Sequence, residues 1–215
     1  MSKIHTKIFT GAASALVTPF KSGKIDHDSL KRLIDFQISE GISALVICGT
    51  TGEASTLSND EYADCIHSAV SYAKGRVSII AGSGSNCTEK AKYLSRIACE
   101  MGADALLLIT PYYNKTNEEG LYRHFCEIAE SVYKPILLYN VPSRTGMNIP
   151  KSVYTKLFEH DNIYGVKEAS YNISEVMDLA SYKKGSFDIY CGNDDITVPM
   201  LSVGGSGVIS VISNI

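Results

Sequence analysis

The sequence has no hydrophobic run long enough to cross a membrane, and its cysteines and histidines form no paired metal-binding motif. None of its six cysteines lies in a C-x-x-C pair, and its five histidines show neither H-x-H nor H-x-x-x-H spacing. We therefore expect no bound metal, and reduced, buried thiols in a cytoplasmic protein. Residues 1–5 lack the apolar core of a secretory signal, so we expect no such signal.

An excess of positive charge is also missing. The formal net charge is −3 at pH 7, which argues against nucleic acid or an anionic membrane as the main partner. The 215 residues, 45% of them hydrophobic and 20% charged, can build one globular domain with a sizeable core. Because no linker or low-complexity run interrupts the chain, we treat residues 1–215 as a single domain.

Strand-like and helix-like patterns alternate along the whole chain. Helix starts are predicted at Asp26 or Asp28, at Ser58 with Glu61, at Thr116 with Glu119, and at Asn172 with Glu175. The predicted strands are residues 13–17, 43–48, 77–81, 103–109, 135–139, 163–167, 187–191 and 207–211.

Several of these strands are apolar on both faces, for example residues 106–109 and 136–138. This is typical of parallel strands that are covered by helices. The repeated strand–helix units with short loops predict an α/β fold, a (β/α)8 TIM barrel. A doubly wound open sheet is the alternative.

The chain stops at Ile215, just after the eighth predicted strand. Barrels of this type typically have about 250 residues or more and carry a helix over the last strand. We therefore expect a barrel truncated after strand 8, either as a fragment or because a C-terminal part is omitted. Apolar surface around Val208, Ile209 and Val211 would then face water.

Lys167 ends the short, apolar sixth predicted strand, and small residues such as Gly165 and Ala169 precede and follow it. Burial of an ammonium disfavours its charged form, so it lowers the pKa of the amine. A neutral lysine amine can attack a ketone and form a Schiff base. The ordinary alternative is a lysine whose side chain reaches out to solvent from the strand end.

Other polar residues follow the predicted strands, where a barrel has its active site. The loop of residues 49–53 (GTTGE) can present N–H groups and hydroxyls to an anion. Tyr139 ends the fifth strand, and Arg144 follows it. Each also has an ordinary interpretation. The loop of residues 49–53 could be a tight turn, Tyr139 a half-buried aromatic residue, and Arg144 a charge exposed to solvent.

Together these segments resemble the dihydrodipicolinate synthase family, also called 4-hydroxy-tetrahydrodipicolinate synthases. The similar segments are residues 49–53 (GTTGE), 111–114 (PYYN), 139–146 (YNVPSRTG) and 165–168 (GVKE), and the similarity runs in register from about Gly11 to the end. The family belongs to the pyruvate-dependent aldolases that work through a Schiff base. Its members are longer than this chain and add a last barrel helix and a helical C-terminal segment.

The resemblance implies the reaction and its residues. Lys167 would form an imine with pyruvate, and the resulting enamine would add to L-aspartate 4-semialdehyde, without a separate cofactor. Tyr139 would move protons and be connected to solvent through Thr50 and Tyr113. Substrate-binding residues would be Thr51, Arg144, Gly192 and Ile209. Because the residue at the position of Tyr113 crosses a subunit interface in the family, a homodimer or homotetramer is implied.

Some family members are inhibited by lysine at the dimer interface. Ser55, Asn86 and Tyr112 match such a site, but Asn59, Tyr62 and Lys90 replace residues of sensitive members. Since Lys90 would repel the ammonium of lysine, we expect weak or absent inhibition.

Three other functions stay open at this point. Sister lyases acting on N-acetylneuraminate or 2-keto-3-deoxy sugar acids share the lysine, the tyrosine and the glycine-rich loop, but a sugar needs no carboxylate-binding Arg144. An inactive barrel fragment is the second possibility. A phosphate-binding isomerase barrel is the third, and it leaves Lys167, Tyr139 and Arg144 unexplained.

Overall fold

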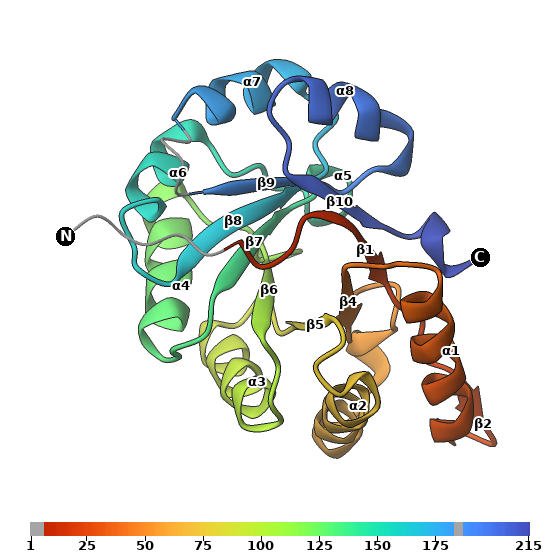
Figure 1. Cartoon of the computed structure of the whole chain (residues 1–215). Helices are drawn as coiled ribbons and strands as arrows, with labels where there is room; N and C mark the ends of the chain where they lie inside the picture. Colours follow the sequence, from red (N-terminus) through yellow and green to blue (C-terminus); the bar gives the residue numbers. More distant parts are fainter. Residues whose placement is uncertain (1–6, 183–186) are drawn as a thin grey trace.

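Eight parallel strands close into a barrel in the computed structural model, which describes residues 7–182 and 187–215 (Figure 1). The N-terminal residues 1–5, for which no signal was predicted, lie outside the described residues. The predicted (β/α)8 barrel is confirmed, and the open sheet is excluded because β1 pairs with both β4 and β10. The barrel strands are β1 (Gly11–Ala15), β4 (Ala44–Ile47), β5 (Ser78–Gly82), β6 (Ala105–Ile109), β7 (Ile136–Asn140), β8 (Ile163–Glu168), β9 (Asp188–Cys191) and β10 (Gly207–Ser210).

Helices lie around the outside of this barrel (Figure 1). Their apolar faces pack on the outward-facing strand residues to form the larger of two hydrophobic clusters. The α-helices are α1 (His27–Ser39), α2 (Asn59–Ala73), α3 (Thr88–Glu100), α4 (Glu118–Glu130), α5 (Pro142–Thr145), α6 (Lys151–Leu157), α7 (Ile173–Tyr182) and α8 (Thr197–Ser202). Short 3-10 helices are η1 (Ala54–Thr56), η2 (Asp194–Ile196) and η3 (Ile212–Asn214).

Most of the predicted helix starts are confirmed. The Asp26 carboxylate accepts the Ser29 N–H at 3.1 Å, and the Ser58–Glu61 capping box is formed on both sides. The predicted cap at Thr116 is wrong, because the neighbouring Asn117 accepts the Gly120 N–H at 2.9 Å. Asparagine and threonine are both good N-caps, so the sequence pattern alone does not separate adjacent candidates.

Several short elements were not predicted, among them a hairpin and a four-residue helix. A short antiparallel hairpin, β2 (Phe20–Lys21) with β3 (Lys24–Ile25), precedes α1. Helix α5, only four residues long, lies between β7 and α6. Neither is long enough to show a hydrophobic period.

The second hydrophobic cluster fills the inside of the barrel. It consists mainly of small and branched residues such as Ala13, Ala44 and Ile209. Phe9 lies just before β1, where its ring stacks on that of Tyr190 with centroids 4.2 Å apart, and the Tyr190 hydroxyl donates to the Phe9 carbonyl at 2.9 Å. The interior of the barrel is therefore a packed core and not a pore.

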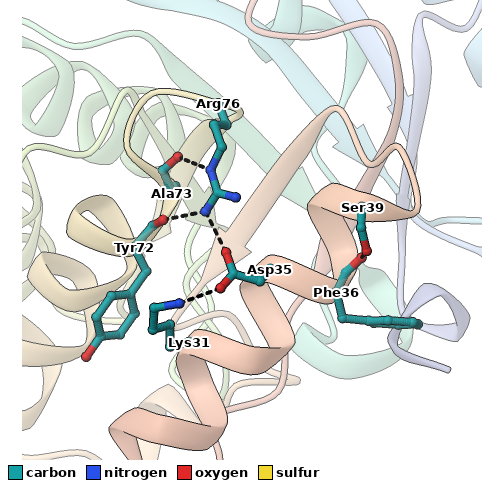
Figure 2. Close-up of polar contacts among 7 residues, drawn as sticks. All are labelled: Lys31, Asp35, Phe36, Ser39, Tyr72, Ala73 and Arg76. Carbon is teal, nitrogen blue, oxygen red and sulfur yellow. Dashed lines mark hydrogen bonds and ion pairs between the residues drawn. The ribbon is translucent and has the colours of Figure 1, made fainter.

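Helices α1 and α2 are joined by an ionic contact (Figure 2). Arg76 donates to the Asp35 carboxylate and to the carbonyls of Tyr72 and Ala73. Lys31 also donates to the Asp35 carboxylate, and these hydrogen bonds hold the pKa of Asp35 below its usual value. Arg76 thus satisfies carbonyls at the end of α2 while holding α1 beside it.

The last described segment turns back onto the first strand. The Asn214 side chain donates to the Ala15 carbonyl at 2.8 Å and accepts the Val17 N–H at 3.1 Å. We expected Ile209 to face water, but it is fully buried, because its side chain points into the barrel. Val208 is partly buried, and Val211 is 46% exposed, as expected.

The prediction of uniformly buried thiols is partly wrong. All six cysteines are free, but Cys87 is exposed because it occupies the N-cap position of α3, and Cys126 is only partly buried. Among the described residues, no cluster of three or more His, Cys, Asp or Glu side chains is placed to hold a metal ion. No helix in the same part of the chain is long and apolar enough to span a membrane.

Candidate active site

Lys167 and Tyr139 lie side by side at the carboxyl ends of neighbouring strands. They are register partners in the β7–β8 pair. Side chains alternate along a strand, and Val166 packs outward, so Lys167 points into the barrel. The Lys167 Nζ lies 4.5 Å from the centroid of the Tyr139 ring. The structure thus brings together the two residues that carry the predicted chemistry.

The Lys167 amine is almost completely removed from water. Its residue is 5% exposed, and burial lowers the pKa from 10.5 to about 8. The nearby Asp194 carboxylate opposes this shift, and the Arg144 guanidinium adds to it. A substantial fraction of the amine is therefore neutral near pH 8, as a nucleophile requires.

Tyr139 is also shielded from solvent. It is 9% exposed, and burial raises the pKa of its phenol, while the Arg144 charge acts in the opposite direction. The phenol keeps its proton at neutral pH and can donate it to a group beside the Lys167 nitrogen.

Gly192 lies against the lysine, and Ile209 lies in the barrel interior. The Gly192 N–H donates to the Glu168 carbonyl at 2.8 Å, and a Cβ on Gly192 would lie 3.0 Å from Lys167 Cε. No larger residue fits there without displacing the lysine. Ile209 belongs to the interior cluster that also contains Tyr139.

Arg144 approaches from helix α5. Thr145 stabilises this short helix, because its hydroxyl donates a hydrogen bond to the Val141 carbonyl at 3.2 Å. Arg144 itself is exposed, yet its charge lowers the pKa of both Lys167 and Tyr139. A guanidinium in this position can bind a carboxylate that enters from solvent.

Thr50 and Thr51 lie in the loop after β4. The loop is a turn in which the Gly52 N–H donates to the Gly49 carbonyl at 3.1 Å, while the Gly52 carbonyl accepts from the Thr18 hydroxyl at 2.7 Å. Thr50 is exposed and Thr51 is partly buried. The loop is therefore anchored, with the two threonines at the mouth of the barrel.

Tyr113 is not brought into this group within one subunit. Its side chain is 92% exposed, and its backbone has a φ of +70°. In the described residues no hydrogen bond joins Tyr113 to Thr50 or Tyr139. The predicted relay through Tyr113 stays a prediction, since it places this residue in a neighbouring subunit.

Asp194 was not predicted as a site residue. Its carboxylate accepts the N–H groups of Val211 and Ile212 at 3.1 and 3.2 Å. Burial raises the pKa of Asp194, but these hydrogen bonds, one from the Ser210 side chain and the Lys167 charge together lower it below its usual value. Its position directly after the seventh strand was the available signal.

The residues considered for lysine inhibition are only partly accessible. The Asn86 side chain donates to the Tyr112 carbonyl at 3.3 Å, so these two are neighbours. Tyr62 is buried under α3 and 3% exposed, whereas Ser55, Asn59 and Lys90 are exposed. The expectation of weak inhibition stays a prediction.

Comparison with known proteins identifies the family. The Dihydrodipicolinate synthetase family matches residues 8–215. The chain is 55% identical over 210 residues to a 4-hydroxy-tetrahydrodipicolinate synthase of Lachnoclostridium phytofermentans, covering 97% of this chain and 71% of that protein. It is 51% identical over 208 residues to the synthase of Acetivibrio thermocellus, covering 97% and 70%.

Solved structures agree with this result. The dihydrodipicolinate synthase of Aquifex aeolicus superposes with a TM-score of 0.94 at 42% identity, covering 96% of this chain and 71% of that one. The match of sequence and fold over nearly the whole chain leads to one conclusion: the chain belongs to the dihydrodipicolinate synthetase family.

Proposed function

We propose that the protein condenses pyruvate with L-aspartate 4-semialdehyde to give 4-hydroxy-tetrahydrodipicolinate, as a lyase of lysine and diaminopimelate biosynthesis. The observation that carries the proposal is the buried Lys167 amine beside the Tyr139 phenol, in a chain 55% identical to a synthase of that name.

The reaction begins at Lys167. Its neutral amine attacks the ketone carbon of pyruvate, and loss of water gives an imine. Protonated, this imine withdraws electrons, so a methyl proton leaves and an enamine forms. No separate cofactor is needed, because the lysine nitrogen itself acts as the electron sink.

The enamine carbon then attacks the aldehyde carbon of the semialdehyde, forming the new carbon–carbon bond. The aldehyde oxygen takes up a proton, which Tyr139 can supply from the neighbouring strand end. The amino group of the semialdehyde next adds to the imine carbon and displaces Lys167, which closes the ring. Thr50, with Tyr113 of a second subunit, would return the Tyr139 proton to solvent.

Two sites bind carboxylates in this proposal. The hydroxyls and N–H groups of Thr50 and Thr51 hold the pyruvate carboxylate, with Gly192 and Ile209 on its other side. Arg144 holds the carboxylate of the semialdehyde. A sugar-acid lyase would have no use for Arg144, and this disfavours that alternative.

Tyr113 argues for assembly. An aromatic side chain that is 92% exposed at the mouth of the barrel, with a left-handed backbone, is poorly explained in a monomer. We propose a homodimer or homotetramer in which Tyr113 enters the site of its partner.

The direct test is turnover of pyruvate with the semialdehyde, comparing the wild type with Lys167→Ala. The variant should lose all activity above background while keeping its fold by circular dichroism. Turnover in the variant at the wild-type rate would exclude the proposed mechanism. A folded wild type that shows no turnover would instead favour the inactive fragment.

A further inference from the structure

A buried polar network lies directly behind the strand ends that carry Tyr139 and Lys167. The next residue on each strand, Asn140 and Glu168, points to the opposite face, and these two are also register partners. Asn140 is fully buried, and Glu168 is 2% exposed. Tyr139 and Lys167 are thus each followed in the sequence by a buried polar residue.

Asn140 is bonded in several directions. Its amide nitrogen lies 3.0 Å from both carboxylate oxygens of Glu168 and 2.7 Å from the side-chain oxygen of Asn148. Its amide oxygen accepts the Ile149 N–H at 3.1 Å. Since Asn148 and Ile149 end the loop that contains α5, Asn140 holds both ends of the segment that presents Arg144.

Glu168 is held from the other side. Its carboxylate accepts the Ser170 N–H at 2.8 Å and the Tyr154 hydroxyl at 3.1 Å. Burial raises the pKa of Glu168, and the hydrogen bonds from Asn140, Ser170 and Tyr154 oppose that rise. A buried group with this many partners has one geometry, because any movement leaves polar atoms unsatisfied.

We infer that Asn140 and Glu168 are positioning residues for the proposed reaction: together they fix the separation of Lys167, Tyr139 and Arg144. Neither side chain faces the substrate, and neither exchanges protons with it. Their effect is to keep two strand ends and one loop in register. This inference rests on the proposed function.

The chain offers a matched control at the opposite end of β8. Asn162 is partly buried, and its side chain donates to the carbonyls of Ala129 and Val132 at 2.9 and 2.6 Å. Like Asn140, it ties a strand to a neighbouring loop, but it lies at the amino end of the barrel, far from the catalytic mouth. Its removal should cost stability without misplacing Lys167.

The test measures kcat, the KM of each substrate, and the rate of imine formation in a single turnover, below the melting temperature of every variant. Asn140→Ala should lower kcat and the rate of imine formation about 10- to 100-fold, as small misplacements of reacting groups do. The KM for the semialdehyde should rise, because the Arg144 loop is released. Asn162→Ala should lower the melting temperature but keep the wild-type kcat.

A second pair of variants covers the case in which Asn140→Ala does not fold. Glu168→Gln keeps the volume but faces Asn140 with a second amide, so its kcat should also fall. Combining Glu168→Gln with Asn140→Asp restores one carboxylate and one amide in contact, and its kcat should exceed that of Glu168→Gln alone.

Two outcomes would overturn the inference: a wild-type kcat in Asn140→Ala or in Glu168→Gln, or the same loss of kcat in Asn162→Ala as in Asn140→Ala. Either leaves the proposed function intact as long as the wild type forms the pyruvate imine and Lys167→Ala does not. If the wild type forms no imine, the proposed function itself fails.

Discussion

The Lys167 amine sets the pH dependence at the scale of single residues. In the proposed mechanism only the neutral amine attacks pyruvate, and burial lowers its pKa from 10.5 to about 8. The rate of imine formation should therefore rise with pH through about pH 8 and level off above it. A rate that keeps rising to about pH 10 would show a lysine with an ordinary pKa.

The Asp194 carboxylate should shift the pH midpoint of imine formation. Its carboxylate raises the pKa of Lys167, so Asp194→Asn should move the midpoint of imine formation to lower pH. Asp195→Asn is the matched control, because it removes the same charge from the next residue, whose carboxylate accepts a hydrogen bond from the Tyr171 hydroxyl. Equal shifts in the two variants would show a general change of charge.

Gly192 leaves room for the lysine. In Gly192→Ala the new methyl group would lie 2.9 Å from the Ala169 Cβ and 3.0 Å from Lys167 Cε, so the lysine must move. We expect kcat to fall about 10- to 100-fold with little change in the fold. Steady-state kinetics with circular dichroism would test this, and an unchanged kcat would contradict the close packing.

The sequence pattern could reveal Lys167 and Tyr139 because the carboxyl ends of parallel strands meet at one end of a barrel. It placed Asp194 after the seventh strand but could not show that this carboxylate acts on Lys167. The Asp194 carboxylate is held in place by the N–H groups of Val211 and Ile212, which follow the next strand. Contacts of this kind depend on barrel closure, which no local period encodes.

At the scale of elements, capping and hydrophobic period explain most of what could be predicted. All eight barrel strands lie within two residues of their predicted ends. The hairpin of β2 with β3 and the short α5 were missed because each is too short to show a period. The cap of α4 was misplaced by one residue, from Asn117 to Thr116, because both side chains can cap.

The capping box of α2 should contribute to the stability of the fold. Ser58 accepts the Glu61 N–H, so Ser58→Ala should lower the free energy of unfolding by about 1 kcal/mol. Because Ser58 is exposed and has no role in the proposed reaction, kcat should stay unchanged. Urea unfolding and steady-state kinetics measure the two quantities, and a loss of kcat without loss of stability would contradict this separation.

For the whole molecule, the packed interior of the barrel leaves the carboxyl ends of the strands for the proposed chemistry. Phe9 lies before β1 at the amino end, whereas Lys167 lies near the carboxyl end of β8 beside Tyr139. The arrangement separates residues that stabilise the barrel from those that act on substrate.

The oligomeric state of the protein should depend on Tyr113. Tyr113→Asp should shift the protein towards monomers, because a charge would replace an aromatic side chain at the proposed interface. Tyr133→Asp is the control, since Tyr133 is also an exposed tyrosine, at 75%, but lies before β7 at the amino end of the barrel. Sedimentation velocity would show the masses. Identical behaviour of both variants would argue against an interface at Tyr113.

The covalent imine on Lys167 is the central intermediate of the proposed mechanism, and it can be trapped by reduction. The folded protein is treated with pyruvate and borohydride, digested and analysed by mass spectrometry. We predict one reduced pyruvate adduct, located on the peptide that contains Lys167 and absent from Lys167→Ala. A folded wild type without an adduct, or with an adduct on another lysine, would exclude Lys167 as the imine-forming residue.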